Sequence, residues 1–195
     1  TDTYYGFDNT VTADKLNNSA LDQYLSLIKL TDEDLKSLIE YFSNVDEKTI
    51  VVFFGDHQPN DTVASTVLAA NGMDYNNLSN EELKLRYQVP YVIWANYDID
   101  AKSDVENVSA NYLSSLMLQQ TNLKMSRYNE FLLNMRNEVP ALNANGYVDK
   151  DGKNHELSEN NEYTKLITQY QYLQYNSLMD KKHVSTDLFS VKDGK

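Results

Sequence analysis

Two short apolar runs constrain the fold of this chain more than any other feature of its sequence. Residues Ile50 to Phe54 read IVVFF without interruption, and a second run, VPYVIWAN, begins around Pro90. Neither run alternates apolar and polar residues, which is typical of strands that are buried on both faces of a sheet. Pro90 is compatible with a strand because a missing N–H is tolerated at its first position. We therefore expect two central strands of a mainly parallel sheet.

Helical patterns flank both apolar runs. Apolar residues recur at steps of three and four from Leu21 to Phe42, and Ser79 with Glu82 forms the pattern of a capping box. These patterns predict helices over 20–43, 79–87, 109–120 and 126–137. Helices that alternate with buried strands are typical of an α/β fold, in which helices flank the sheet.

The character of the sequence changes after Pro140. The segment GYVDKDGKNHEL places Asp151-Gly152 between two short polar strands, which indicates a hairpin. A helix is predicted over 159–180, and VSTDLFSV at 184–191 suits a last strand. We expect a first domain over residues 1–140, opened by an irregular lead-in over 1–18, and a small hairpin-plus-helix subdomain over residues 141–195.

The composition excludes several classes of protein. The net charge is −12 and the basic residues form no stripe, so the phosphate backbone of a nucleic acid would be repelled. No apolar stretch is long enough to span a bilayer, and no basic-apolar leader opens the chain, so we expect any targeting segment to lie outside it. The absence of cysteine excludes disulfides, zinc-thiolate sites and thiol nucleophiles.

The sequence contains fifteen tyrosines but only one tryptophan. A tyrosine ring can cover apolar surface while its hydroxyl stays hydrated, so these residues are suited to packing at the rim of a core. The alternative is a surface of aromatic rings that binds carbohydrate or another polymer.

The tripeptide Gly55-Asp56-His57 is the principal candidate site. It follows the first strand, and α/β proteins bind ligands beyond the carboxyl ends of their strands. Gly55 permits a sharp turn, so Asp56 and His57 need not point to opposite faces. A carboxylate and an imidazole together suit Mn²⁺, Zn²⁺ or Mg²⁺. The alternative is a solvated turn aspartate beside a histidine that only packs.

The runs TIVVFFGDHQP and VPYVIWANYD resemble the C-terminal half of the catalytic domain of lipoteichoic acid synthase-type phosphoglycerol transferases. These enzymes belong to the sulfatase and alkaline phosphatase superfamily. Supporting similarity lies in YLSLIKLTDEDLKSLIEYF, SANYLSSLMLQQTNL and YQYLQYNSLMDKK, so the resemblance spans most of residues 17 to 183. It implies an alkaline phosphatase-like fold, with residues 1–140 as the C-terminal half of the catalytic domain.

The resemblance also implies a metal-dependent enzyme at the extracellular face of the bacterial cell membrane. Asp56 and His57 match the family's adjacent Asp-His ligands of a divalent metal, for which Mn²⁺ is expected first and Mg²⁺, Zn²⁺ or Ca²⁺ are alternatives. Such enzymes use a threonine, serine or formylglycine nucleophile to attack phosphorus or sulfur centres. Neither Thr3 nor Thr10 shows the flanking pattern of that nucleophile. His155 and His183 match no ligand of the family, and we expect both to be solvated.

Several expectations follow from the missing nucleophile. The chain is interpreted as a fragment of a longer, membrane-anchored protein and is expected to be inactive alone. Its expected partners are the missing N-terminal half of the parent chain and an envelope glycerol-phosphate polymer or lipid substrate, and self-association would be another way to cover its sheet. Sulfate esters are an alternative substrate class. The competing hypothesis is a non-catalytic domain that binds envelope polymer.

Overall fold

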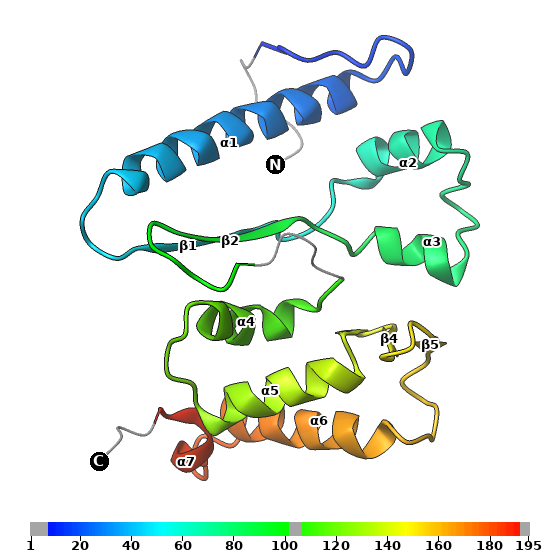
Figure 1. Ribbon diagram of the computed structural model, residues 1–195. Helices are drawn as coiled ribbons and strands as arrows, with labels where there is room; N and C mark the ends of the chain where they lie inside the picture. The colour runs from blue at the N-terminus through cyan, green and yellow to red at the C-terminus, as the bar shows by residue number, and fades with distance from the viewer. Residues whose placement is uncertain (1–7, 102–106, 192–195) are drawn as a thin grey trace. The chain divides into compact units, whose positions relative to one another are not determined.

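A computed structural model describes residues 8–101 and 107–191 of the protein (Figure 1). The chain divides into two compact units, Thr1–Tyr97 and Asp98–Lys195. This division differs from the domain boundary predicted near residue 140. Among the described residues, no helix combines the length and the apolar character that a membrane span requires.

The first unit contains one long helix, two shorter helices and a pair of strands. Their order along the chain is α1 (Ser19–Ser43), β1 (Ile50–Phe54), α2 (Asp61–Ala70), α3 (Asn80–Leu85) and β2 (Tyr91–Ala95). The predictions of α1, β1, α3 and β2 are confirmed, and the capping box of Ser79 and Glu82 is present. Helix α2 was not predicted from the sequence, because its apolar residues form only a weak periodic pattern.

The strand direction differs from the prediction. Strands β1 and β2 pair antiparallel, with Ile50 opposite Ala95 and Phe54 opposite Tyr91. The expectation of a mainly parallel sheet was therefore wrong for the described strands. A continuous apolar run indicates that a strand is buried but not whether it runs parallel or antiparallel to its neighbour. The connection through α2 and α3 is long enough for either strand direction. Phe54 and Val92 are also 55% and 45% exposed, so neither strand is buried on both faces within this chain.

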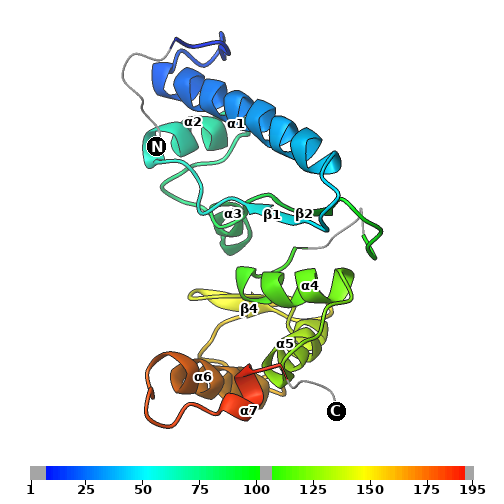
Figure 2. The same cartoon turned by 90° about the vertical axis from the view of Figure 1, so that its left-hand side faces the viewer.

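Helices α1 and α2 lie on the same side of the strand pair (Figures 1 and 2). Their contact is held by Asn18, the N-cap of α1. Its side-chain oxygen accepts a hydrogen bond from the Leu21 N–H, and its Nδ2 donates to Thr66 Oγ1 in α2 over 2.7 Å. Leu21, Val63 and Leu68 form the small buried core between the two helices. The lead-in is joined to α1 through Ser26, whose hydroxyl accepts from the N–H groups of residues 10 and 11.

Asn96 joins the end of β2 to the connection between α1 and β1. Its Nδ2 lies 3.1, 2.9 and 2.9 Å from the carbonyl oxygens of Phe42, Val45 and Glu47. Its Oδ1 accepts a hydrogen bond from the Thr49 N–H over 2.8 Å. One carboxamide therefore serves backbone groups at the end of α1 and in the turn that follows it.

The second unit packs short helices against a small sheet. Its elements are η1 (Ala110–Tyr112), α4 (Leu113–Gln120), α5 (Arg127–Glu138), β3 (Ala141–Asn143), β4 (Gly146–Val148), β5 (Asn154–His155), α6 (Thr164–Leu178) and α7 (Thr186–Phe189). The sheet is antiparallel with the order β3-β4-β5, which confirms the predicted hairpin. The last segment forms α7 where a strand was predicted. The ring centroids of Phe189 in α7 and Tyr128 in α5 are 5.0 Å apart. This is a tertiary contact, which cannot be predicted from local sequence propensity.

Residues on both sides of Pro140 belong to this one unit. The Ser109 N–H donates to the Pro140 carbonyl, and the Ser109 hydroxyl donates to the Leu142 carbonyl. The buried Tyr112 hydroxyl donates to the Val139 carbonyl over 2.8 Å. These bonds tie the hairpin segment to η1 within this unit.

Tyrosines make up much of the core of the second unit. Buried tyrosines come from η1, from β4 and from the start and middle of α6: Tyr112, Tyr147, Tyr163 and Tyr170. This agrees with the packing role predicted for tyrosine. Tyr172 and Tyr175 are exposed on α6, whereas Tyr4 and Tyr5 lie outside the described residues.

We expect Asn96→Ala to destabilise the first unit by about 2 kcal/mol, because it leaves the Thr49 N–H without its acceptor and removes the two N–H donors beside the Phe42, Val45 and Glu47 carbonyls. Urea unfolding followed by fluorescence of Trp94 in β2, the only tryptophan, measures the effect. Asn71→Ala is the matched control, since the Asn71 side chain donates one exposed bond to the Val67 carbonyl. Equal losses in the two variants would contradict the role given to Asn96.

Candidate metal-binding site and a buried histidine cluster

The candidate site begins where β1 ends. The Gly55 N–H donates to the Pro90 carbonyl over 3.0 Å, which extends the contact with the segment before β2 by one residue. A Cβ at position 55 would lie 2.9 Å from Val89 Cβ, closer than side chains normally approach. Glycine is therefore needed here because a side chain would overlap that of Val89.

Asp56 and His57 lie side by side after Gly55, as predicted. Asp56 Oδ2 is 3.4 Å from His57 Nε2, and the side chains are 84% and 76% exposed. His57 Nδ1 is 2.8 Å from the Gln58 carbonyl oxygen, which can only accept. The proton therefore belongs on Nδ1, and the lone pair of Nε2 is free to bind a metal ion beside the Asp56 carboxylate. The donor atoms present fit a divalent metal.

The loop that follows is fixed to the segment before β2 by two side chains that the sequence analysis did not single out. The Gln58 carboxamide donates to the Gln88 carbonyl. Arg86 donates to Asp61 Oδ1 over 3.0 Å and to the Pro59 carbonyl over 3.5 Å, and its guanidinium lies over the ring of Tyr75. We infer that these contacts limit the movement of Asp56 and His57. No local sequence pattern indicates them, because Arg86 is 25 residues from Asp61.

The described residues provide no third ligand for this pair. Within residues 8–101 and 107–191, no group of three or more His, Cys, Asp or Glu side chains is arranged to hold a metal ion. His183 is 77% exposed beside Asp180, which confirms the expectation that it is solvated. His155 differs from the same expectation, because its side chain is only 7% exposed.

His155 is the centre of a buried cluster in the second unit. Its Nε2 lies 2.7 Å from Asp149 Oδ2 and its Nδ1 lies 2.7 Å from Glu159 Oε2. Its ring stacks on that of Tyr147, with centroids 4.8 Å apart, and the Tyr147 hydroxyl accepts from Asn161. Asp149 also accepts the N–H groups of residues 151 and 153, which closes the hairpin turn.

The carboxylates change the protonation of the ring. The hydrogen bonds that the ring donates, first to Asp149 and then to Glu159, raise the pKa of His155 above its usual 6.5. Burial favours the neutral form of Asp149, but the bonds from His155 and two backbone N–H groups outweigh it and lower the pKa of this carboxyl. The bond from His155 likewise lowers the pKa of Glu159. Both ring nitrogens are occupied, so the imidazolium joins β5 to the segment before α6 and leaves neither nitrogen free for catalysis.

The sequence alone did not indicate this cluster. Asp149, His155 and Glu159 are spaced by six and four residues, and such spacing places no side chains together until the hairpin is formed. Only the pairing of β4 with β5 brings Tyr147 opposite His155.

Comparisons with known proteins identify relatives of the chain. The family model described as Sulfatase matches residues 1–123. A putative cyclic beta-1,2-glucan modification protein of Rhizobium meliloti (strain 1021) is 26% identical over 176 residues, which cover 89% of this chain and 27% of that protein. The chain thus corresponds to about a quarter of the length of this curated relative.

A solved structure has the same fold. The Streptococcus pyogenes phosphoglycerol transferase GacH, in complex with sn-glycerol-1-phosphate, superposes with a TM-score of 0.57 at 18% sequence identity. The similarity covers 95% of this chain and 42% of that one. It confirms the expected α/β class and the alkaline phosphatase-like fold.

We expect Gly55→Ala to destabilise the first unit by about 1 to 3 kcal/mol, because the added methyl group meets Val89 Cβ. In a Val89→Gly background the same substitution should cost less, since the contacting Cβ and γ1-methyl group of Val89 are gone. Urea unfolding of the two single variants and the double variant measures the coupling. An unchanged cost in the Val89→Gly background would show that the close approach is not the cause.

The folded second unit holds the proton of His155 more tightly than the unfolded chain does, because folding raises the pKa of this ring. We therefore expect the second unit to lose stability as the pH rises from about 6.5 through the raised pKa. The lowered pKa values of Asp149 and Glu159 predict a separate loss at acid pH. Thermal unfolding of the chain at a series of acid to alkaline pH values, followed through the NMR signals of residues 107–191, measures both losses of stability. His155→Gln should remove the loss above pH 6.5, and His183→Gln, at an exposed histidine, should retain it; the reverse result would contradict the assignment.

Proposed function

This chain belongs to the sulfatase family, and we propose that it carries the Asp-His part of the metal centre of an envelope phosphoglycerol transferase-type enzyme. The observation that carries this proposal is the pair formed by Asp56 and His57 at the end of β1, with His57 Nε2 free. The family is generally metal-dependent, which supports a metal at these donors.

In the proposed centre, Asp56 supplies a carboxylate oxygen and His57 supplies Nε2. The Gln58 carbonyl holds the tautomer of His57, and Arg86 holds the loop through Pro59 and Asp61. This mixed oxygen and nitrogen donor set suits Mn²⁺ first, with Mg²⁺, Zn²⁺ or Ca²⁺ as alternatives. A bound metal ion of this kind would activate a hydroxyl nucleophile and neutralise charge on the group being transferred.

The remaining ligands and the nucleophile would come from other parts of the parent protein. We propose glycerol-phosphate esters of the cell envelope as substrate and sulfate esters as the alternative, at the extracellular face of the membrane. The glycerol phosphate held by the structural relative and the glucan modification named for the curated relative support an envelope substrate. On this proposal the 195-residue chain is inactive by itself.

The exposed apolar residues at the ends of the two strands are compatible with a further covering surface. Phe54 and Val92 are both exposed in the first unit, as is Tyr41 at the end of α1. We propose that the N-terminal half of the parent chain covers them, with self-association of the isolated chain as the alternative.

We expect the chain to bind Mn²⁺ and both Asp56→Ala and His57→Ala to weaken that binding by at least about 10-fold, because each removes a ligand. Titration followed by the EPR signal of free Mn²⁺ measures the affinity. Asp180→Ala and His183→Ala are matched controls, since they remove another Asp-His pair of the surface, in which His183 is exposed, Asp180 is half-buried, and Oδ1 and Nδ1 are 2.8 Å apart.

Equal weakening by the control substitutions would show only general attraction of the cation to an acidic protein. That outcome, or Mn²⁺ binding that survives the loss of both Asp56 and His57, would overturn the proposed centre.

A further inference from the structure

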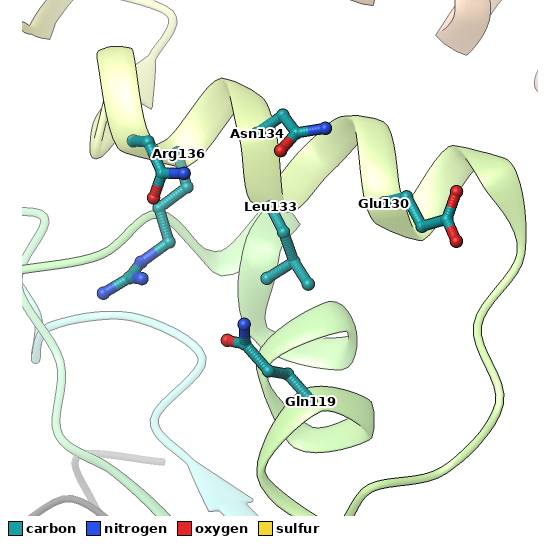
Figure 3. Close-up of a pocket in the computed structure, with 6 residues that line it drawn as sticks. Gln119, Glu130, Leu133, Asn134 and Arg136 are labelled. Atoms are coloured by element: carbon teal, nitrogen blue, oxygen red, sulfur yellow. The ribbon is translucent and has the colours of Figure 1, made fainter.

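A pocket of about 320 Å³ lies between α4 and α5, wholly within the second unit (Figure 3). It is lined by five polar residues and one leucine: Gln119, Glu130, Leu133, Asn134, Arg136 and Asn137. None of them belongs to the candidate metal site or to the His155 cluster. The volume is at the lower end of the range for small-ligand sites in proteins.

Arg136 is the unusual member of this lining. Its Nε is buried and has no hydrogen-bond partner, and no carboxylate of the described residues lies within 4.0 Å of its guanidinium. This is unexpected in a chain with 29 acidic residues, where Arg86, by contrast, is paired with Asp61. Glu138, two residues further along the same chain, is paired with Lys150 over 2.8 Å. A buried donor without a partner is costly, so it needs an explanation.

The positions of the other side chains favour an anion beside Arg136. In Figure 3 the Gln119 carboxamide points from α4 toward α5, and the Arg136 guanidinium and the Leu133 side chain both extend from α5 toward α4. The Glu130 carboxylate lies at the opposite end and points away from Arg136. Negative charge on the lining is therefore separated from the guanidinium.

We propose that this pocket binds a small oxyanion whose remainder carries hydroxyl groups. The planar guanidinium of Arg136 suits two oxygens of a phosphate or carboxylate group. The carboxamides of Gln119 and Asn137 can both donate to and accept from hydroxyl groups, while Leu133 packs against a carbon chain. Arg136 thereby gains an anionic partner that residues 8–101 and 107–191 do not provide.

The probe is sn-glycerol-1-phosphate, a choice that rests on the proposed function. It is titrated into the full chain in EDTA, with inorganic phosphate and glycerol as separate arms, while NMR follows the Arg136 Nε–H and the Gln119 side-chain amide. We expect both signals to shift, glycerol phosphate to bind at least about 3-fold more tightly than phosphate, and glycerol alone to bind negligibly. Equal affinity for phosphate and glycerol phosphate would overturn the hydroxyl-binding part of the proposal.

Arg136→Gln should weaken binding at least about 10-fold, the range expected for loss of a hydrogen bond to a charged group. Arg127→Gln is the matched control, because it removes the same charge from an exposed position at the start of the same helix. Gln119→Ala, also at an exposed position, should weaken the binding of glycerol phosphate more than the binding of phosphate. This variant tests the pocket if the Arg136→Gln protein does not fold.

Equal weakening by Arg127→Gln and Arg136→Gln, or no shift of the Arg136 signal, would overturn the site. Asp56→Ala should leave this binding unchanged. The pocket and the metal centre can therefore fail independently of each other, because the titration contains no free metal ion.

Discussion

The antiparallel register of β1 and β2 positions the candidate metal site. One residue beyond the paired strands, the Gly55 N–H donates to the Pro90 carbonyl. Position 55 then lies so close to the Val89 side chain that only glycine fits. The same register brings the Gln88 carbonyl and Arg86 beside the loop over residues 56–61. An exposed aspartate and histidine thus lie on a loop whose backbone is fixed at several points, which is the condition for a well-defined metal site.

The second unit depends on polar groups that are buried with their partners. The buried tyrosines contribute large apolar surfaces, and the Tyr112 and Tyr147 hydroxyls are hydrogen-bonded. His155 with its two carboxylates joins the hairpin to the segment before α6. In this unit the buried Nε of Arg136 and the buried Nδ2 of Asn111 are the exceptions among the described residues, since neither has a hydrogen-bond partner.

Local patterns predicted the individual elements well where capping and apolar periodicity agree. The long helix over Ser19–Ser43, both strands of the first unit and the capping box at Ser79 follow from such patterns. The motif at Asp56 and His57 was also found from sequence, because adjacent residues after a glycine at a strand end require no long-range contact. Its role as a metal centre stays a prediction.

The sequence by itself determined the α/β class, the family and the position of the candidate pair along the chain, because these depend on local propensity and contiguous motifs. Only the tertiary structure decided the antiparallel direction of β1 and β2, the burial of His155 and the isolation of Arg136. Each of these depends on residues far apart in the sequence or on a folded turn. A pattern of apolar residues reports that a segment is buried, but the partner that buries it is set by packing.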